Sequence, residues 1–195
     1  MAKDTRDRIL QACISCFADQ GYAGTTTRTL AAAAQVNVAT LAYHFGDKEG
    51  LYTAAIDSLY ERFQSVQPDL SLLAADTSRE RVERVVRFAY GFAREQRTAV
   101  RLLLRHVLEE GSLPGKVRDD WALKLLDVAE SAWGLIGLPP DPHWKLKLLA
   151  VNHLVVRFAI TPEQDLAPFT DAAEPHKAIE EVLIDLVVRA LLKES

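Results

Sequence analysis

The stretch RTLAAAAQVNVATLAYHFGDKEG, residues 28–50, decides the fold of the N-terminal part of this chain. Its alanine-rich start predicts a short helix at about 27–34, and Gln35–Val36 predicts a tight turn behind it. Asn37 is a strong N-cap, because its side-chain oxygen can accept from the free backbone N–H groups of a helix start. A second short helix is therefore expected at about 38–45.

Helices are also expected on both sides of this pair. Gly46 is a natural stop residue, and Asp47 is expected to cap a longer helix that runs to about residue 66. Upstream, apolar residues at intervals of three and four predict an amphipathic helix over about 3–20, which Gly21 would end. The N-terminal part is thus expected to hold three shorter helices followed by a long one.

The rest of the chain carries the same helical pattern. Hydrophobic residues make up 49% of the 195 residues, and the 8 prolines and 9 glycines cluster between long apolar-periodic segments. Further helices are expected over about 78–95, 97–110, 116–137, 143–160 and 175–193. The sequence therefore predicts an all-α protein of about nine helices with ample material for a core.

The charge balance does not identify a partner. The formal net charge is −4, so the whole chain lacks the basic balance typical of nucleic-acid-binding proteins. Residues 1–48 carry five cations against four acids, whereas residues 49–195 carry 18 cations against 23 acids. The N-terminal part is therefore at most weakly positive, and charge alone does not decide whether it binds nucleic acid.

The hydrophobic segments predict a cytoplasmic protein without membrane contact. The first apolar run is broken by Asp and Arg, which argues against a signal peptide. No apolar run approaches the roughly 18 uninterrupted residues that a membrane span needs.

Three helices with a tight turn between the second and the third follow the helix-turn-helix plan. In that plan the second helix braces the third, and the third is narrow enough to lie in the major groove of DNA. The residues spaced to pack inward are Leu30, Ala34, Val36, Leu41 and Phe45. The residues between them on the third helix are left to face outward.

The same residues carry a resemblance to a known family. The matching positions are Arg8-Ile9-Leu10, Ala12, Phe17, Gly21-Tyr22, Thr25-Thr26, Leu30-Ala31, Ala34, Val36, Leu41, Tyr43-His44-Phe45, Lys48-Glu49 and Leu51. Over about 50 residues the chain resembles the DNA-binding domain of the TetR/AcrR family of bacterial repressors. The resemblance implies a helix-turn-helix DNA-binding domain over 1–48 and a helical ligand-binding and dimerisation domain over 49–195. It also implies a homodimer on double-stranded DNA with a palindromic operator, released by a small-molecule effector.

The resemblance assigns roles to individual residues. Contacts to DNA phosphates are implied for Thr26, Thr27, Tyr43, His44 and Lys48. Arg28 would project into the groove, where its guanidinium could donate two hydrogen bonds to a guanine.

The predicted reading face departs from the family pattern. Asn37 stands where the family usually has serine and still caps, whereas Gln35 stands where glycine is common. The outward residues that follow are Val38, Ala39, Thr40 and Ala42. Such groups can pack on thymine methyls but read few donors or acceptors, so we expect thymine-rich positions in each half-site. A helix-turn-helix that no longer binds DNA is the alternative.

Two C-terminal helices have more apolar surface than one core needs. The helix expected at 175–193 is apolar around about three quarters of its circumference, and the helix at 143–160 is similar. A partner subunit is the simplest cover for this surface. We therefore expect these two helices to form a four-helix seam in a twofold homodimer.

A regulatory pocket would need apolar walls with a few polar groups. The candidates are Phe88, Phe92, His106, Trp121, Trp133 and Asn152. They predict a mainly hydrophobic or aromatic effector. His106 and Asn152 could equally be core residues whose polar groups have hydrogen-bond partners within the protein. Asn152 could also lie at the dimer seam.

Cys13 and Cys16 are the only cysteines, spaced as C-x-x-C within a helical pattern. Two small core residues are the first interpretation; a thiol-redox-responsive regulator or redox protein is the alternative. The sequence has no Gly-rich phosphate loop, no Ser/His/Asp order and no metal-ligand spacing. We therefore expect no enzyme activity, no cofactor and no metal, and a helical adaptor that binds only protein remains a third class.

Overall fold

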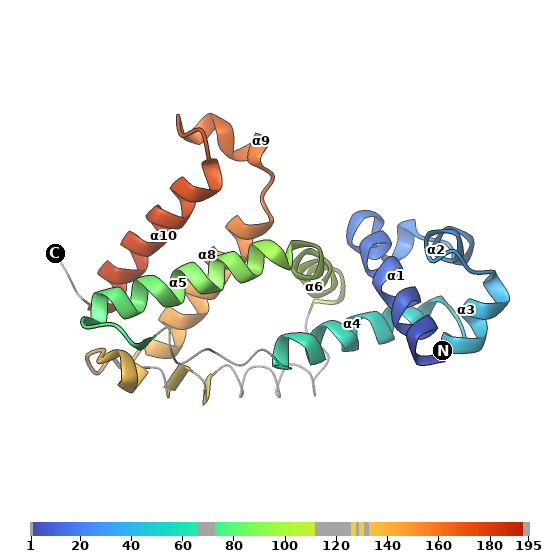
Figure 1. Ribbon diagram of the computed structural model, residues 1–195, viewed down its shortest axis with the longest axis horizontal. Helices are drawn as coiled ribbons and strands as arrows, with labels where there is room; N and C mark the ends of the chain where they lie inside the picture. The colour runs from blue at the N-terminus through green and yellow to red at the C-terminus, as the bar shows by residue number, and fades with distance from the viewer. Residues whose placement is uncertain (1, 66–72, 112–125, 128, 131–132, 193–195) are drawn as a thin grey trace. The chain divides into compact units, whose positions relative to one another are not determined.

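The computed structural model describes residues 2–65, 73–111, 126–127, 129–130 and 133–192, and every regular element in these ranges is helical (Figure 1). The expected all-α fold is therefore confirmed. The chain divides into two compact units: Met1–Val66 with Thr98–Asp119, and Gln67–Arg97 with Asp120–Ser195.

The first unit contains α1 (Ala2–Gly24), α2 (Thr27–Ala33), α3 (Val38–Phe45), α4 (Lys48–Ser65) and α6 (Arg97–Glu110). Its core is built from side chains that are at most 1% exposed: Ile9, Cys13, Phe17, Leu30, Leu41, Leu51, Ala55, Leu59 and Leu102. All five of these helices supply residues to this core. Burial of this shared apolar surface is what holds the short helices α2 and α3 in place, since helices of their length are marginal alone.

The end of α1 departs from the expected stop at Gly21. The hydrogen-bonded helical pattern continues to Gly24, but Gly21 itself has φ 75° and ψ 172°, so the helix breaks there. The positive φ favours glycine at this position, where a Cβ would lie 2.9 Å from Nη1 at the end of the Arg105 side chain on α6. The break turns the chain toward α2.

The second unit contains α5 (Ser78–Glu95), α8 (Trp144–Ile160), α9 (Glu163–Leu166), the 3₁₀ turn η2 (Ala167–Phe169) and α10 (Pro175–Leu192). Helix α5 packs against both α8 and α10, which also contact each other. The core between them includes Val82, Val86, Tyr90, Val155, Ala159, Leu183, Val187 and Val188. Within the described residues, none of the helices is long and apolar enough to cross a membrane.

Two parts of the second unit differ from the expected helices. The helix expected at 116–137 lies mostly outside the described residues, although 133–136 are helical. The short α9 and η2 lie between the helices expected at 143–160 and 175–193, where no helix was expected.

The first compact unit is larger than the segment 1–48 expected to bind DNA. Leu51, Ala55 and Leu59 of α4 and Leu102 of α6 are buried in its core. The two helices therefore brace the N-terminal helices, because these could not bury their apolar faces alone. A functional boundary at residue 48 stays a prediction.

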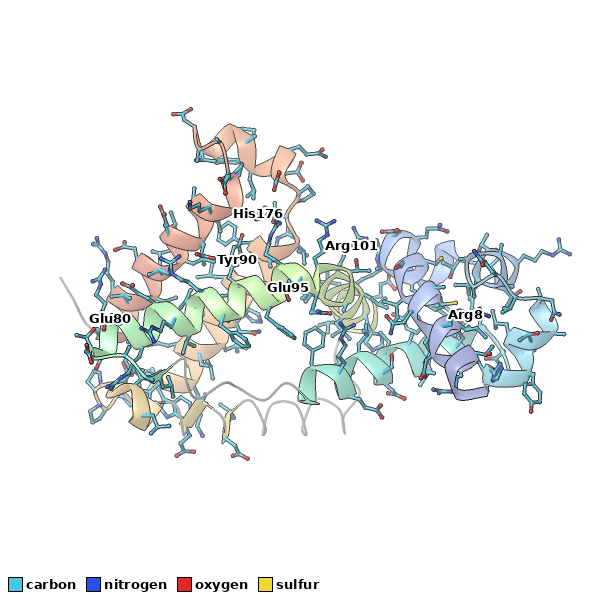
Figure 2. All side chains as sticks on the ribbon, viewed as in Figure 1. Arg8, Glu80, Tyr90, Glu95, Arg101 and His176 are labelled. Atoms are coloured by element: carbon cyan, nitrogen blue, oxygen red, sulfur yellow. The ribbon has the colours of Figure 1, made fainter. Side chains whose placement is uncertain are left out.

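A buried histidine links α10 to α5. The Tyr90 hydroxyl and His176 Nδ1 are 2.7 Å apart, and both residues are labelled in Figure 2. Burial lowers the pKa of His176 below its usual value, and the positive charge of Arg94 lowers it further. Glu163 and the main chain of Thr161 act in the opposite direction.

This burial predicts that the protein loses stability in mild acid. The folded pKa of His176 lies below the unfolded value near 6.5, so the unfolded chain binds the proton more readily. The contribution of neutral His176 to the free energy of unfolding is complete above about pH 6.5. It is lost as the pH falls from there through the folded pKa of His176. Thermal unfolding of His176→Gln, which keeps a partner for Tyr90 but does not titrate, should show a smaller fall in Tm on acidification.

An equal fall in Tm for wild type and His176→Gln would contradict the prediction.

Candidate nucleic-acid interface

Helix α2 begins at a capping box. The Thr26 side chain accepts from the N–H of Thr29 at 3.2 Å, and the Thr29 hydroxyl accepts from the N–H of Thr26 at 2.9 Å. Both residues are exposed, and Thr27 beside them is partly exposed. The reciprocal bonds fix the direction in which α2 leaves the preceding turn.

The turn between α2 and α3 has the hydrogen bonds of a Schellman motif. The N–H of Val36 donates to the carbonyl of Ala31 at 3.0 Å, and the N–H of Gln35 donates to Ala32 at 3.1 Å. Gln35 has φ 55°, the left-handed conformation that glycine adopts most easily. The tight turn expected at Gln35–Val36 is therefore present, in spite of the absence of glycine.

Asn37 caps α3, as the sequence predicts. Its Oδ1 accepts from the Thr40 N–H at 2.7 Å and from the Thr40 hydroxyl at 2.9 Å. The proton of the Thr40 hydroxyl is thereby used inside the protein. Thr40 can offer a base its methyl group and oxygen lone pairs, but not this donor.

The inward side of the motif is packed as expected. Leu30, Ala34 and Leu41 are at most 3% exposed, and Val36 and Phe45 pack against the same core while partly buried. The faces of α2 and α3 that carry the predicted DNA contacts are thus directed away from the core.

Most predicted contact residues are at the surface. Tyr43 is 84% exposed and Val38 is 43% exposed. Arg28, Asn37, Ala39 and Ala42 are also exposed, and Thr40, His44 and Lys48 are partly exposed. The Tyr43 and His44 rings meet edge-on with centroids 5.1 Å apart. The surface of α3 therefore combines small apolar groups with two aromatic residues near its end.

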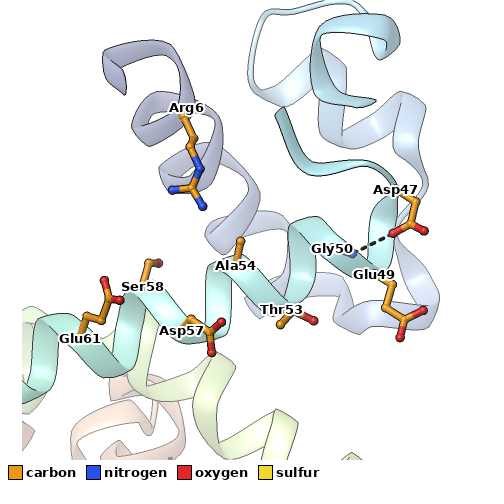
Figure 3. A pocket seen from close by; sticks show the side chains of 9 residues that line it. All are labelled: Arg6, Asp47, Glu49, Gly50, Thr53, Ala54, Asp57, Ser58 and Glu61. Carbon is orange, nitrogen blue, oxygen red and sulfur yellow. Dashed lines mark hydrogen bonds between the residues drawn. The ribbon is translucent and has the colours of Figure 1, made fainter. Parts of the chain in front are cut away.

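Glycine at position 50 allows α4 to approach the end of α3. A Cβ on Gly50 would lie 2.2 Å from the carbonyl oxygen of Phe45, far inside van der Waals contact. The Gly50 N–H also donates to Asp47 Oδ1 at 2.8 Å, drawn as a dashed line in Figure 3. Gly50 was not among the predicted site residues, because a glycine in a first helical turn has no periodic signal.

Lys48 is held by the chain itself. Its Nζ donates to the carbonyls of Tyr22 at 2.9 Å and Thr25 at 3.1 Å. The ammonium also lies 4.0 Å from the centroid of the Tyr22 ring. These contacts join the first turn of α4 to the segment before α2.

A cleft of about 600 Å³ lies beside α4, and Figure 3 shows it between the start of α1 and this helix. Its charged lining residues are Arg6, Asp47, Glu49, Asp57 and Glu61. None of the predicted pocket residues lines it. The excess of carboxylates makes this cleft unsuited to DNA phosphate.

The two cysteines are poor candidates for redox chemistry. Burial raises the pKa of the Cys13 thiol to about 12, with a further contribution from Cys16. Burial also raises the pKa of Cys16, as does Asp19. Since the thiolate is the reactive species, both are poorly reactive near neutral pH. The thiol of Cys13 instead contacts the Leu30 carbonyl at 3.9 Å, between α1 and α2.

Four of the predicted pocket residues lie in the second unit. Phe88 and Phe92 stack along α5 with centroids 6.2 Å apart. The ring centroids of Trp133 and Trp144 are 5.6 Å apart. The indole N–H of Trp133 donates to the Pro139 carbonyl at 3.2 Å. Asn152 is partly buried on α8.

The other two predicted pocket residues differ from these. His106 belongs to the core of the first unit, where its Nδ1 lies 3.2 Å from the Tyr52 hydroxyl. Trp121 lies outside the described residues.

Helix α2 begins at a capping box, and α3 packs against the core with its outer face exposed. This arrangement is typical of helix-turn-helix DNA-binding regulators. Residues 9–55 match the family described as bacterial regulatory proteins, tetR family. The N-terminal segment therefore matches the DNA-binding domain of this family of transcriptional regulators. The family and the relatives that match are regulators, not enzymes, and the thiol-redox alternative is not supported.

Similar proteins extend the likeness beyond the matched segment. The chain is 24% identical over 156 residues to the probable HTH-type transcriptional regulator YttP of Bacillus subtilis (strain 168), covering 76% of this chain and 75% of YttP. It is 27% identical over 110 residues to the HTH-type transcriptional repressor NicS of Pseudomonas putida, covering 56% of this chain and 51% of NicS. The match to NicS thus spans about half of that protein.

The fold is shared with solved structures along nearly the whole chain. The crystal structure of AibR in complex with isovaleryl coenzyme A and operator DNA matches with a TM-score of 0.67 and 20% identity. The match covers 93% of this chain and 97% of AibR. At this identity the likeness shows the fold.

Proposed function

We propose that the protein is a ligand-responsive repressor that binds a palindromic operator as a homodimer and is released by a small effector. The observation that carries the DNA-binding part is the exposed surface of α3 with Arg28 on the adjacent α2. The named repressor NicS among the relatives supports repression. A mobility-shift assay with the duplex upstream of the protein's own coding sequence tests the proposal.

Base recognition is proposed to combine one polar contact with several apolar ones. Arg28 is exposed, and its guanidinium can donate two parallel hydrogen bonds to guanine. Val38, Ala39 and Ala42 present apolar groups from α3, which fit thymine methyls. Thr40 adds a methyl group, since its hydroxyl proton is already used by Asn37.

Contacts to phosphate are proposed for residues at the two edges of this surface. Thr26 and Thr27 lie at the start of α2, where backbone N–H groups and the helix dipole favour an anion. Tyr43 and His44 lie near the end of α3, where the Tyr43 hydroxyl is well placed to reach outward because the residue is 84% exposed. These contacts would position the reading helix without selecting a sequence.

The homodimer is proposed to form through α8 and α10. Both helices expose large apolar side chains: Leu146 at 66%, Leu149 at 42%, Leu154 at 39%, Val182 at 52% and Leu186 at 47%. Large apolar side chains exposed on neighbouring helices commonly mark a protein interface. A twofold dimer would bury the same surface from both copies and would present two reading helices to the two halves of a palindrome.

Replacing Leu186 with glutamate should convert the dimer to a monomer, because it would place a carboxylate in the desolvated centre of the interface. Sedimentation velocity measures the change, and operator affinity should fall with it. Leu108→Glu is the control, since Leu108 is 83% exposed on α6 and lies outside the proposed interface. A Leu186→Glu variant that remained dimeric would show that this face is not the interface.

The effector is proposed to be a mainly hydrophobic or aromatic compound bound by the helices of the second unit. The stacked Phe88 and Phe92 support an apolar wall on α5. AibR, which shares the fold, is seen with isovaleryl coenzyme A, a ligand with a short apolar acyl group. A thermal-shift screen of such compounds, followed by DNA release, tests this part of the proposal.

A further inference from the structure

We propose that Lys48 positions the start of α2 from inside the protein and is not a phosphate ligand. The inference rests on the proposed DNA binding and changes the role expected for this residue. Its ammonium donates to the carbonyls of Tyr22 and Thr25 and lies over the Tyr22 ring.

The contacts account for most of what a lysine can donate. An ammonium has three N–H donors and no acceptor. Two of these donors point to main-chain carbonyls, and the ring centroid lies within the range of a cation–π contact. The positive charge is therefore offset by protein dipoles before DNA arrives.

The carbonyls belong to a short segment that needs such support. The chain leaves α1 at Gly21 in the left-handed region and enters α2 at the cap residue Thr26. Between them, the hydroxyl of Thr25 donates to the Tyr22 carbonyl at 3.0 Å, and Thr25 is only 2% exposed. Lys48 adds the long-range bonds, from 26 and 23 residues away, that tie this segment to α4.

The function of this tie follows from the position of Arg28. Arg28 lies two residues after Thr26, in the first turn of α2, so the direction of the segment sets where its guanidinium enters the groove. Lys48 thus acts on recognition through the orientation of α2. A phosphate ligand would instead act through its own charge.

The salt dependence of operator binding separates the two roles. Lys48→Met keeps the alkyl stem and removes the ammonium. A positioning residue predicts weaker binding at every salt concentration, with the slope of log K against log salt unchanged. Loss of a phosphate contact would instead reduce that slope by about 0.9 per subunit. The probe is the duplex upstream of the protein's own coding sequence, read by fluorescence anisotropy on the full chain.

Lys48→Arg provides a second discrimination. A guanidinium serves a phosphate at least as well as an ammonium, but its planar fork does not suit two converging carbonyls and a ring. The positioning role therefore predicts that Lys48→Arg binds nearly as weakly as Lys48→Met. Arg28→Met, at the residue proposed to contact guanine, is the control that loses affinity without a change at Lys48.

Two measurements without DNA keep the inference separate from the proposed function. Amide hydrogen exchange at Thr25–Thr29 should be faster in Lys48→Met than in the wild type, and unchanged in Arg28→Met. In the unaltered protein, the ¹⁵N signal of the Lys48 ammonium should be visible without DNA, because bonded ammonium protons exchange slowly.

The same measurements can overturn the inference. It fails if the ammonium signal emerges only after duplex is added, or if Lys48→Met lowers the salt slope while exchange stays unchanged. If the wild type does not bind the duplex but the exchange and ammonium results are as expected, the proposed function fails and the structural role of Lys48 stands.

Discussion

Replacing Arg28 with alanine is expected to weaken operator binding by about tenfold or more and to remove the preference for one G·C pair in each half-site. A bidentate contact between arginine and guanine is worth about 1–3 kcal/mol of discrimination. The outward face of α3 offers few polar groups to compensate, since Thr40 uses its proton on Asn37. The measurement is binding to a set of duplexes with every single base change in the half-site.

The control for this prediction is Arg79→Ala. Arg79 is an exposed arginine on α5, paired with Glu83 at 3.0 Å within the same helix. Its removal should leave the affinity and the preference unchanged. If Arg28→Ala kept full discrimination at every position of the half-site, the proposed reading mechanism would be wrong.

Replacing Gly50 with alanine is expected to destabilise the first unit and to impair DNA binding. The new Cβ would lie 2.2 Å from the Phe45 carbonyl oxygen, so α4 and the end of α3 would have to separate. Forcing extra atoms into a packed contact typically costs about 1–3 kcal/mol. Thermal unfolding and operator affinity measured on the same preparation should both decrease.

Gly91→Ala is the matched control. Gly91 lies within α5, and a Cβ there would meet nothing within 4 Å. Alanine should stabilise this helix by roughly 0.5–1 kcal/mol, because glycine loses more backbone entropy on folding. A Gly50→Ala variant as stable as the wild type would show that the contact between α4 and Phe45 relaxes freely.

Local signals in the sequence were sufficient for the motif itself. The caps at Asn37 and Asp47 and the inward residues Leu30 and Leu41 follow from rules that act over a few residues. The turn was also expected, although Gln35 adopts a conformation that its residue type does not favour. These features depend on hydrogen bonds and side-chain directions within one or two helical turns.

Contacts between distant residues could not be predicted in the same way. A phosphate contact was predicted for Lys48 from the resemblance, and its bonds to Tyr22 and Thr25 are indicated by no periodicity. His106 was a pocket candidate because it interrupts an apolar run, yet its partner Tyr52 is 54 residues away. Such pairings depend on how helices pack, and the pattern within a single helix does not contain that information.

The most direct test of the account is the binding of the full chain to the duplex upstream of its own coding sequence, followed over a range of salt concentrations. The account predicts a complex that survives excess unrelated duplex, weakens as salt rises, and loses most of its affinity in Arg28→Ala. Equal affinity for the upstream duplex and an unrelated duplex of the same length and base composition would contradict it.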